Sequence, residues 1–169
     1  MLKYFLGCCL LALSFYGFAE QQTWYFVRHF EKQPGDNPSL TKIGRARAEA
    51  LAAFFSDKPL SHVYSTEYKR TLETVTPVTV LKNLSIEYYD PQNLVEFATN
   101  IKTLDHVLVV GHSNTTPQLL SLMGGENIHI EETDYGVVYK LQKHDLGHST
   151  QSIQTVSYTT LTLPTKRIV

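Results

Sequence analysis

A continuous apolar run, Val107-Leu108-Val109-Val110, constrains the fold of this chain more than any other segment. A strand with one face in solvent alternates apolar and polar residues, whereas a strand buried on both faces is apolar throughout. Strands of the second kind belong to parallel sheets that carry helices on both faces. The run therefore predicts a central parallel strand, and the strand delivers Gly111 and His112 at its carboxyl end.

Predicted strands and helices alternate through most of the chain, which is the pattern of an α/β fold. We expect a three-layer sandwich in which a mostly parallel central sheet is flanked by helices. The last two predicted strands alternate β-branched and polar residues and are expected to be antiparallel edge pieces. The predicted strands lie at 23–27, 60–65, 86–89, 105–111, 135–141 and 155–163, and the predicted helices at 41–55, 66–75, 93–103 and from Pro117 to just before Gly124.

Several residues predict how the helices begin and end. Thr41 is a suitable N-cap for the first helix, and Ser65 or Thr66 for the second. Gly44 lies in the first turn of an otherwise Ala-rich helix, where glycine costs about 1 kcal/mol relative to alanine. We interpret it as a position where another backbone approaches closely. Pro77 is expected to end or kink the second helix.

The first nineteen residues have the pattern of a secretory signal peptide. Lys3 precedes an apolar stretch from Tyr4 to about Phe15, and Gly17 and Ala19 are small residues at the cleavage positions. The alternative is a membrane anchor, but the apolar stretch is shorter than the roughly 20 residues of a spanning helix. We therefore expect residues 1–19 to be removed, which leaves residues 20–169 as a single domain in the periplasm or outside the cell.

The composition of the expected mature chain excludes several classes of function. Cys8 and Cys9 leave with the signal peptide, so no disulfide, thiolate nucleophile or cysteine-bound zinc is expected. Loss of Lys3 leaves 14 basic and 16 acidic residues, a net charge of −2. Nucleic-acid binders carry a strong basic excess, so no nucleic-acid partner is expected. No later segment is apolar enough to cross a membrane, and we expect no membrane association after cleavage.

Histidines and arginines follow the predicted strands at the edge where ligands bind in open α/β sheets. Arg28 and His29 end the first strand, His112 ends the central strand, and Arg70 lies in the first turns of the second helix. Taken singly, each has a structural explanation, and Arg70 has Glu67 and Glu73 as nearby ion-pair partners. Together they would repel one another unless an anion joined them. A tetrahedral phosphate matches the bidentate geometry of arginine.

The chain at this point resembles the histidine phosphatase superfamily, whose fold is phosphoglycerate-mutase-like. The similar motifs occur in the same order and span Thr23 to about Gly125, and the short chain resembles the compact members of the superfamily. The motifs are Val27-Arg28-His29-x-Glu31-Lys32, Leu40-Thr41-x-x-Gly44-x-x-x-Ala48, Tyr64-Ser65-x-x-x-x-Arg70-Thr71-x-Glu73-Thr74 and Val109-x-Gly111-His112-Ser113-Asn114.

The resemblance implies phosphoryl transfer in two steps. His29 would attack phosphorus and form a phosphohistidine, which water then hydrolyses. Arg28, Arg70 and His112 would hold the non-bridging oxygens, and His112 would be cationic when it does so. Neither a metal nor another cofactor is implied, and the expected partner is a small phosphorylated substrate.

The resemblance also implies supporting roles, and the chain departs from the pattern in two places. Asn114 would add a hydrogen bond to the substrate, and Glu31 would orient the loop or the His29 ring. Phe30 stands where the family usually has a small residue, so we expect it to crowd or line the pocket floor. The family's proton donor is commonly an acidic residue in mid-chain. Asp90 is our candidate and Glu96 the second, although Asp90 before Pro91 also suits a turn.

The sequence thus favours an exported, metal-independent phosphatase that acts on a small phosphomonoester. Without a proton donor the site would favour phosphohistidines or phosphoanhydrides, whose leaving groups depart more easily. A non-catalytic phosphate-binding module is the alternative from another class. Residues 124–134 carry four acidic side chains and are expected to form a loop near the mouth of the site.

Overall fold

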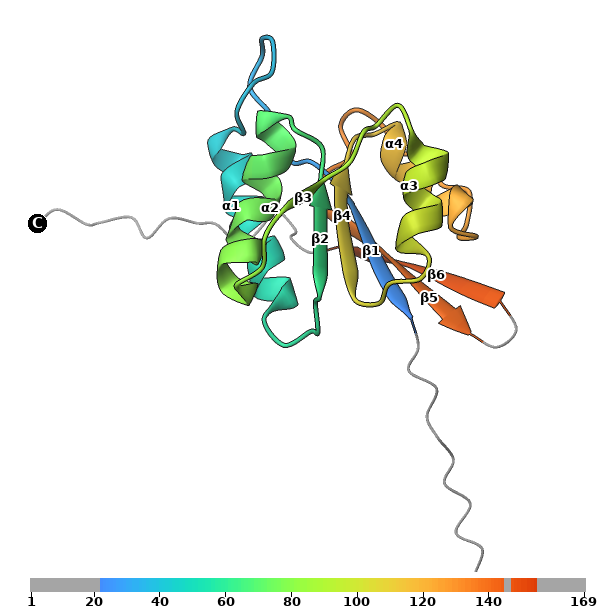
Figure 1. Cartoon of the computed structure of the whole chain (residues 1–169). Coiled ribbons are helices and arrows are strands. Elements are labelled where there is room, and N and C mark those ends of the chain that lie inside the picture. The colour runs from blue at the N-terminus through green and yellow to red at the C-terminus, as the bar shows by residue number, and fades with distance from the viewer. Residues whose placement is uncertain (1–21, 145–146, 155–169) are drawn as a thin grey trace, which may run out of the picture.

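The computed structural model describes residues 22–144 and 147–154. The predicted signal peptide, at 1–19, and the predicted last strand, at 155–163, lie outside these residues. The described part is built around one sheet of six strands, with helices on both faces (Figure 1). The strands are β1 Thr23–Arg28, β2 His62–Ser65, β3 Glu87–Tyr88, β4 Val107–Gly111, β5 Val137–His144 and β6 Gly147–Gln154, and the helices are α1 Lys42–Phe55, α2 Lys69–Lys82, α3 Leu94–Ile101 and α4 Thr115–Leu122.

The order of the strands is β3-β2-β4-β1-β5-β6. Strands β3, β2, β4 and β1 run parallel to one another, whereas β5 is antiparallel to β1 and β6 is antiparallel to β5. The predicted α/β fold with a mostly parallel sheet is therefore confirmed. The apolar strand β4 lies between β1 and β2, as expected for a strand that is buried on both faces.

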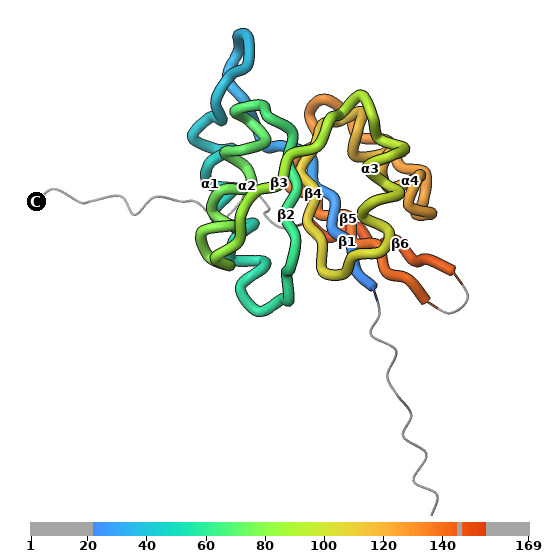
Figure 2. The backbone as a smooth tube through the Cα atoms, in the orientation of Figure 1, coloured from blue at the N-terminus to red at the C-terminus, as the bar shows by residue number. Residues whose placement is uncertain are grey.

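Helices α1 and α2 cover one face of the sheet, and α3 and α4 cover the other (Figures 1 and 2). Side chains of β1 alternate between the two faces, which is the period of a strand. Trp24 and Phe26 are buried in the cluster that includes side chains of α3 and α4. Tyr25 and Val27 are buried in the cluster that includes side chains of α1 and α2. The covered faces confirm the three-layer sandwich.

The predictions for the start of α1 are confirmed. The Thr41 side chain accepts a hydrogen bond from the Gly44 N–H at 3.0 Å, and the Thr41 N–H donates to the Glu31 carbonyl at 2.8 Å. A Cβ on Gly44 would collide with that same Glu31 carbonyl oxygen. The first turn of α1 therefore packs directly on the segment that follows His29, and the glycine permits the close approach.

The predicted N-cap of α2 is wrong, because the N-cap is Tyr68 and not Ser65 or Thr66. Of the two outcomes predicted for Pro77, the helix end is wrong, since the helix continues to Lys82, and the kink stays a prediction. An internal proline costs about 3 kcal/mol. Val75 and Val78 flank it and are fully buried, and burial of each stabilises the fold by about 1.5–3 kcal/mol. This burial offsets the cost of the proline, so the helix does not end there.

Candidate active site

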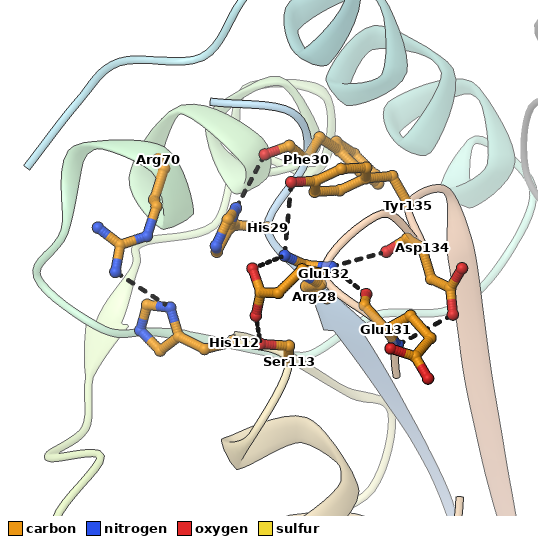
Figure 3. Close-up of polar contacts among 10 residues, drawn as sticks. All are labelled: Arg28, His29, Phe30, Arg70, His112, Ser113, Glu131, Glu132, Asp134 and Tyr135. Atoms are coloured by element: carbon orange, nitrogen blue, oxygen red, sulfur yellow. Dashed lines mark hydrogen bonds and ion pairs between the residues drawn. The ribbon is translucent and has the colours of Figure 1, made fainter. Parts of the chain in front are cut away.

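The carboxyl ends of β1 and β4 bring two histidines together. The His29 N–H donates to the Gly111 carbonyl at 2.9 Å, which extends the pairing of these strands by one residue beyond Arg28. The His29 and His112 rings consequently lie edge to face, with centroids 5.5 Å apart. Arg70, from the first turn of α2, reaches the same place, and its Nη2 lies 3.4 Å from Nδ1 of His112 (Figure 3).

A cavity of about 410 Å³ opens over these side chains. It contains four of the predicted site residues, namely His29, Arg70, His112 and Asn114, whereas Arg28, Glu31 and Asp90 are not part of its lining. The complete lining is His29, Lys32, Tyr68, Arg70, Pro91, Gln92, His112, Ser113, Asn114, Thr115 and Glu132.

His29 is held in a form suited to nucleophilic attack. Its Nδ1 lies 2.8 Å from the Phe30 carbonyl oxygen, which only accepts hydrogen bonds, so Nδ1 carries the proton. In the neutral ring Nε2 then has a free lone pair. Burial is the main cause that lowers the pKa of His29, to about 3, and the nearby His112 and arginines lower it further. The ring is therefore neutral at physiological pH, as a nucleophile must be.

His112 is also neutral in its protein surroundings. Burial, followed by the charges of Arg70 and Arg28, lowers the pKa of His112 to about 4. Its Nε2 lies 3.1 Å from the Thr66 hydroxyl. The predicted cationic form of His112 belongs to the phosphate-bound site and stays a prediction. A phosphate dianion beside the ring would favour the cation and raise this pKa.

Arg70 is oriented for an anionic ligand. Its guanidinium lies 4.4 Å from the centroid of the Tyr68 ring, and its buried Nε has no hydrogen-bond partner among the described residues. The structural alternative was an ion pair with Glu67 or Glu73. Glu73 instead accepts from the Leu40 N–H at 2.9 Å, and no ion pair of Arg70 occurs in the described part of the chain.

Arg28 differs from the prediction, because it is directed at a loop and not into the cavity. The residue is 3% exposed. Its Nη1 donates to the carbonyls of Glu131 at 2.6 Å and Asp134 at 3.2 Å. Its Nη2 lies 2.9 Å from Oε2 of Glu132, and the guanidinium stacks on the Tyr135 ring at 4.3 Å. The acidic loop does lie at the mouth, as predicted, and it engages Arg28 (Figure 3).

Glu31 and Phe30 support the site from behind. The Glu31 carboxylate pairs with Nε of Arg47 in α1 at 2.8 Å, so it orients the loop, while the Phe30 carbonyl orients the His29 ring. The expectation that Phe30 lines the pocket is wrong. Its side chain is fully buried in the cluster beneath α1 and α2, and its N–H donates to Thr74 Oγ1 at 3.1 Å.

The two candidate proton donors are both exposed. The Asp90 carboxylate accepts from the Gln92 N–H at 2.8 Å, which is the turn arrangement that the sequence also suggested. Pro91 and Gln92 line the cavity, although Asp90 does not. Glu96, in the first turn of α3, accepts a hydrogen bond from the side chain of Asn93, the N-cap residue of that helix. The role of Asp90 in proton donation stays a prediction.

The structure adds residues that the sequence reasoning did not select. Lys32, Tyr68 and Ser113 line the cavity. Lys32 and Ser113 belong to the recognised motifs, and Tyr68 lies two residues before Arg70, so their place in the sequence was a usable signal. Glu132 carried no such signal, because it lies twenty residues beyond His112 in a loop whose path follows from the fold.

Within residues 22–144 and 147–154, no three His, Cys, Asp or Glu side chains gather in an arrangement that could hold a metal ion. No helix in that part of the chain has the length and apolar character needed to span a membrane.

The fold and the site define an α/β protein with a histidine and arginine anion site at the carboxyl edge of its sheet. The sequence model of the histidine phosphatase superfamily (branch 1) matches residues 22–101. This match covers just under half of the chain and confirms the resemblance that the motifs indicated. No curated protein matches the sequence.

Solved structures of proteins described as phosphatases have a similar fold. The protein histidine phosphatase SixA in complex with tungstate is 14% identical, with a TM-score of 0.65 over 79% of this chain and 97% of that one. An α-ribazole-5′-phosphate phosphatase of Escherichia coli is 13% identical, with a TM-score of 0.66 over 79% and 96%. A mycobacterial glucosyl-3-phosphoglycerate phosphatase is 10% identical, with a TM-score of 0.60 over 81% and 100%.

Proposed function

We propose that this chain is an exported, metal-independent phosphatase that hydrolyses a small phosphomonoester through a phosphohistidine on His29. The observation that carries the proposal is the state of His29, whose Nδ1 proton is held by the Phe30 carbonyl while Nε2 is free. A buried neutral imidazole beside Arg70 and His112 is a nucleophile next to an anion site.

The residues act mainly by position and charge. Arg70 binds the non-bridging oxygens, and the phosphate it holds favours the cationic form of His112, which then donates to the same group. Nε2 of His29 attacks phosphorus in line with the departing oxygen. Water then attacks the phosphohistidine, and the P–N bond breaks to restore His29.

The substrate class rests on the surroundings of the cavity. A second cavity of about 550 Å³ shares Pro91 and Gln92 with the first. No charged side chain lines it, since its walls are formed by prolines, amides, Ser121 and apolar residues of α3 and α4. A small, uncharged leaving group fits these walls, and inside the first cavity Glu132 disfavours polyanions.

A phosphohistidine or phosphoanhydride is the second candidate substrate. The position of Asp90 favours it, because the predicted proton donor does not line the cavity and such leaving groups need no donor. SixA, named as a protein histidine phosphatase, shares the fold. The third candidate, a phosphate-binding module without turnover, would need Arg70 but not His29.

Hydrolysis of an aryl phosphate tests the proposal, because its leaving group departs without a proton donor. The protein from Glu20 onward is assayed with excess chelator beside His29→Ala and His62→Ala, the latter an equivalent change at the start of β2. We expect turnover that survives the chelator, disappears in His29→Ala and persists in His62→Ala. Rapid quenching in alkali, which preserves phosphohistidine, should show a mass increase of one phosphoryl group on the peptide that contains His29.

The outcomes separate the candidates. Tight phosphate binding without turnover, unchanged in His29→Ala, would identify a binding module. Loss of activity with chelator would contradict metal independence. Export is tested separately: expression of the full chain in a bacterium should release a periplasmic or secreted product whose first residue is Glu20.

A further inference from the structure

Glu132 is the carboxylate that the structure places in the cavity with both histidines. Its Oε2 lies 2.9 Å from Nη2 of Arg28, and its Oε1 accepts a hydrogen bond from the Ser113 hydroxyl at 2.6 Å. In Figure 3 its side chain lies between His29 and Ser113. It therefore bridges the end of β1 and the residue that follows His112.

Glu132 and His29 differ strongly in solvent exposure, although both line the cavity. His29 is 3% exposed and forms the floor, whereas the Glu132 side chain is 79% exposed at the mouth. In an in-line displacement the leaving oxygen lies opposite the attacking atom. A nucleophile on the floor therefore directs the leaving oxygen toward the mouth, where Glu132 lies.

The ion pair with Arg28 does not prevent Glu132 from acting there. Arg28 retains hydrogen bonds from Nη1 to two loop carbonyls when Nη2 changes its partner. The Glu132 side chain is 79% exposed, so water can solvate the carboxylate when it leaves Arg28. A phosphate oxygen that approaches Arg28 can thus replace the carboxylate, which stays beside Ser113.

We propose that Glu132 is the catalytic residue that donates the proton to the leaving oxygen and later accepts one from water. The proposal rests on the proposed phosphatase function. The substrate enters as a monoanion and passes its proton to Glu132. Nε2 of His29 then forms the P–N bond, the P–O bond to the leaving group breaks, and the Glu132 proton moves to the departing oxygen. In the second step water forms a P–O bond and gives a proton to Glu132, while the P–N electron pair returns to Nε2. Glu132 then passes this proton to the product phosphate, which leaves as the monoanion and restores the carboxylate.

The electrostatics follow the same sequence. In the structure Ser113 and then Arg28 lower the pKa of Glu132, so the carboxylate is the ionised partner of Arg28. Replacement of that contact by a phosphate removes the stabilising cation and adds a like charge, and both changes raise the pKa of a carboxyl group. The group thereby becomes a proton donor when the substrate is bound.

The test compares leaving groups. Glu132→Gln, Asp90→Asn and Glu126→Gln are assayed on an aryl phosphate and on an alkyl phosphate, beside the unaltered protein. Glu126 is the matched control, because it belongs to the same acidic segment and does not line the cavity. The step that depends on the leaving group is formation of the phosphohistidine, which rapid quenching follows. We expect Glu132→Gln to slow this step by about 10²–10⁴-fold with the alkyl ester and to leave it nearly unchanged with the aryl ester. Glu126→Gln should retain both activities, and Asp90→Asn tests the competing assignment.

Each other result overturns the assignment. Equal slowing of phosphohistidine formation from both esters would show a structural role for Glu132, and a lower KM with unchanged kcat would show only competition for Arg28. A selective loss on the alkyl ester in Asp90→Asn would return the role to Asp90. If the unaltered protein hydrolyses neither ester, the proposed function has failed, and that result is distinct from a failure of Glu132 alone.

Discussion

Acid should destabilise this protein through the same two histidines that form its site. The folded-state pKa of His29 is about 3 and that of His112 about 4, both far below the value near 6.5 of an unfolded chain. Between these values the unfolded chain binds protons that the folded chain does not, so stability falls as pH falls below 6.5. The stability that depends on the two neutral histidines is fully present above pH 6.5 and is lost progressively as the pH falls to about 3–4.

The size of the effect follows from the unfolded-state value. A pH of 5.0 lies about 1.5 units below the pKa of a histidine in the unfolded chain, and each unit is worth about 1.36 kcal/mol. Between pH 7.5 and pH 5.0, His29 should therefore lower the free energy of unfolding by about 2 kcal/mol. His112 should lower it by about the same amount or somewhat less, because it is less buried. The result does not depend on the folded-state values so long as both stay well below 5.

Urea unfolding at pH 7.5 and pH 5.0 measures this loss. His29→Gln removes the titrating group, and we expect its free energy of unfolding to fall by about 2 kcal/mol less than that of the unaltered protein over the same interval. His62→Gln, an exchange at the start of β2 far from the site, serves as the matched control. Equal losses in the unaltered protein and in His29→Gln would refute the argument that burial keeps His29 neutral.

Three further predictions concern the anion site and its support. Arg70→Ala should weaken binding of inorganic phosphate about 10–100-fold in titration calorimetry, because a charge-assisted hydrogen bond is worth about 1.5–3 kcal/mol, whereas the exposed Arg45→Ala should not. The His112 ring should titrate at higher pH when phosphate is added, as followed by NMR, and an unchanged pKa would contradict its proposed contact with the anion. Gly44→Ala should lower stability in urea by up to about 2 kcal/mol, since overpacking of about 1–3 kcal/mol against Glu31 exceeds a helix gain of about 1 kcal/mol.

Much of the fold could be predicted because its determinants are local in sequence. The apolar run of β4, the N-cap at Thr41 and the close-approach glycine at Gly44 each act over a few residues, and the structure shows all of them. Strand β6 was missed because its residues, GHSTQSIQ, lack apolar alternation. It lies at the edge of the sheet, where strands are polar and partly exposed, and its pairing with β5 positions it.

The site was predicted only in part, because strand ends were treated as equivalent. His29, Arg70 and His112 do converge, since β1, β2 and β4 run parallel and end at the same edge of the sheet. Arg28 is the last residue of β1, however, and its side chain continues the alternation of Trp24 and Phe26. It therefore lies on the face of α3 and α4, where the loop after α4 contacts it.

This alternation links the register of β1 to the proposed chemistry. Arg28 pairs with Gly111 in the sheet, and the next residue, His29, donates to the Gly111 carbonyl. A shift of one residue would exchange the faces of Arg28 and His29, because side chains alternate with a period of two. The nucleophile would then face the acidic loop and the arginine would occupy the floor of the cavity. The same shift would exchange the buried Trp24 and Phe26 with Tyr25 and Val27 between the two apolar clusters, which disfavours it. The packing behind the strand thus determines which of two adjacent residues faces the cavity as the candidate nucleophile and which one holds the loop that carries Glu132.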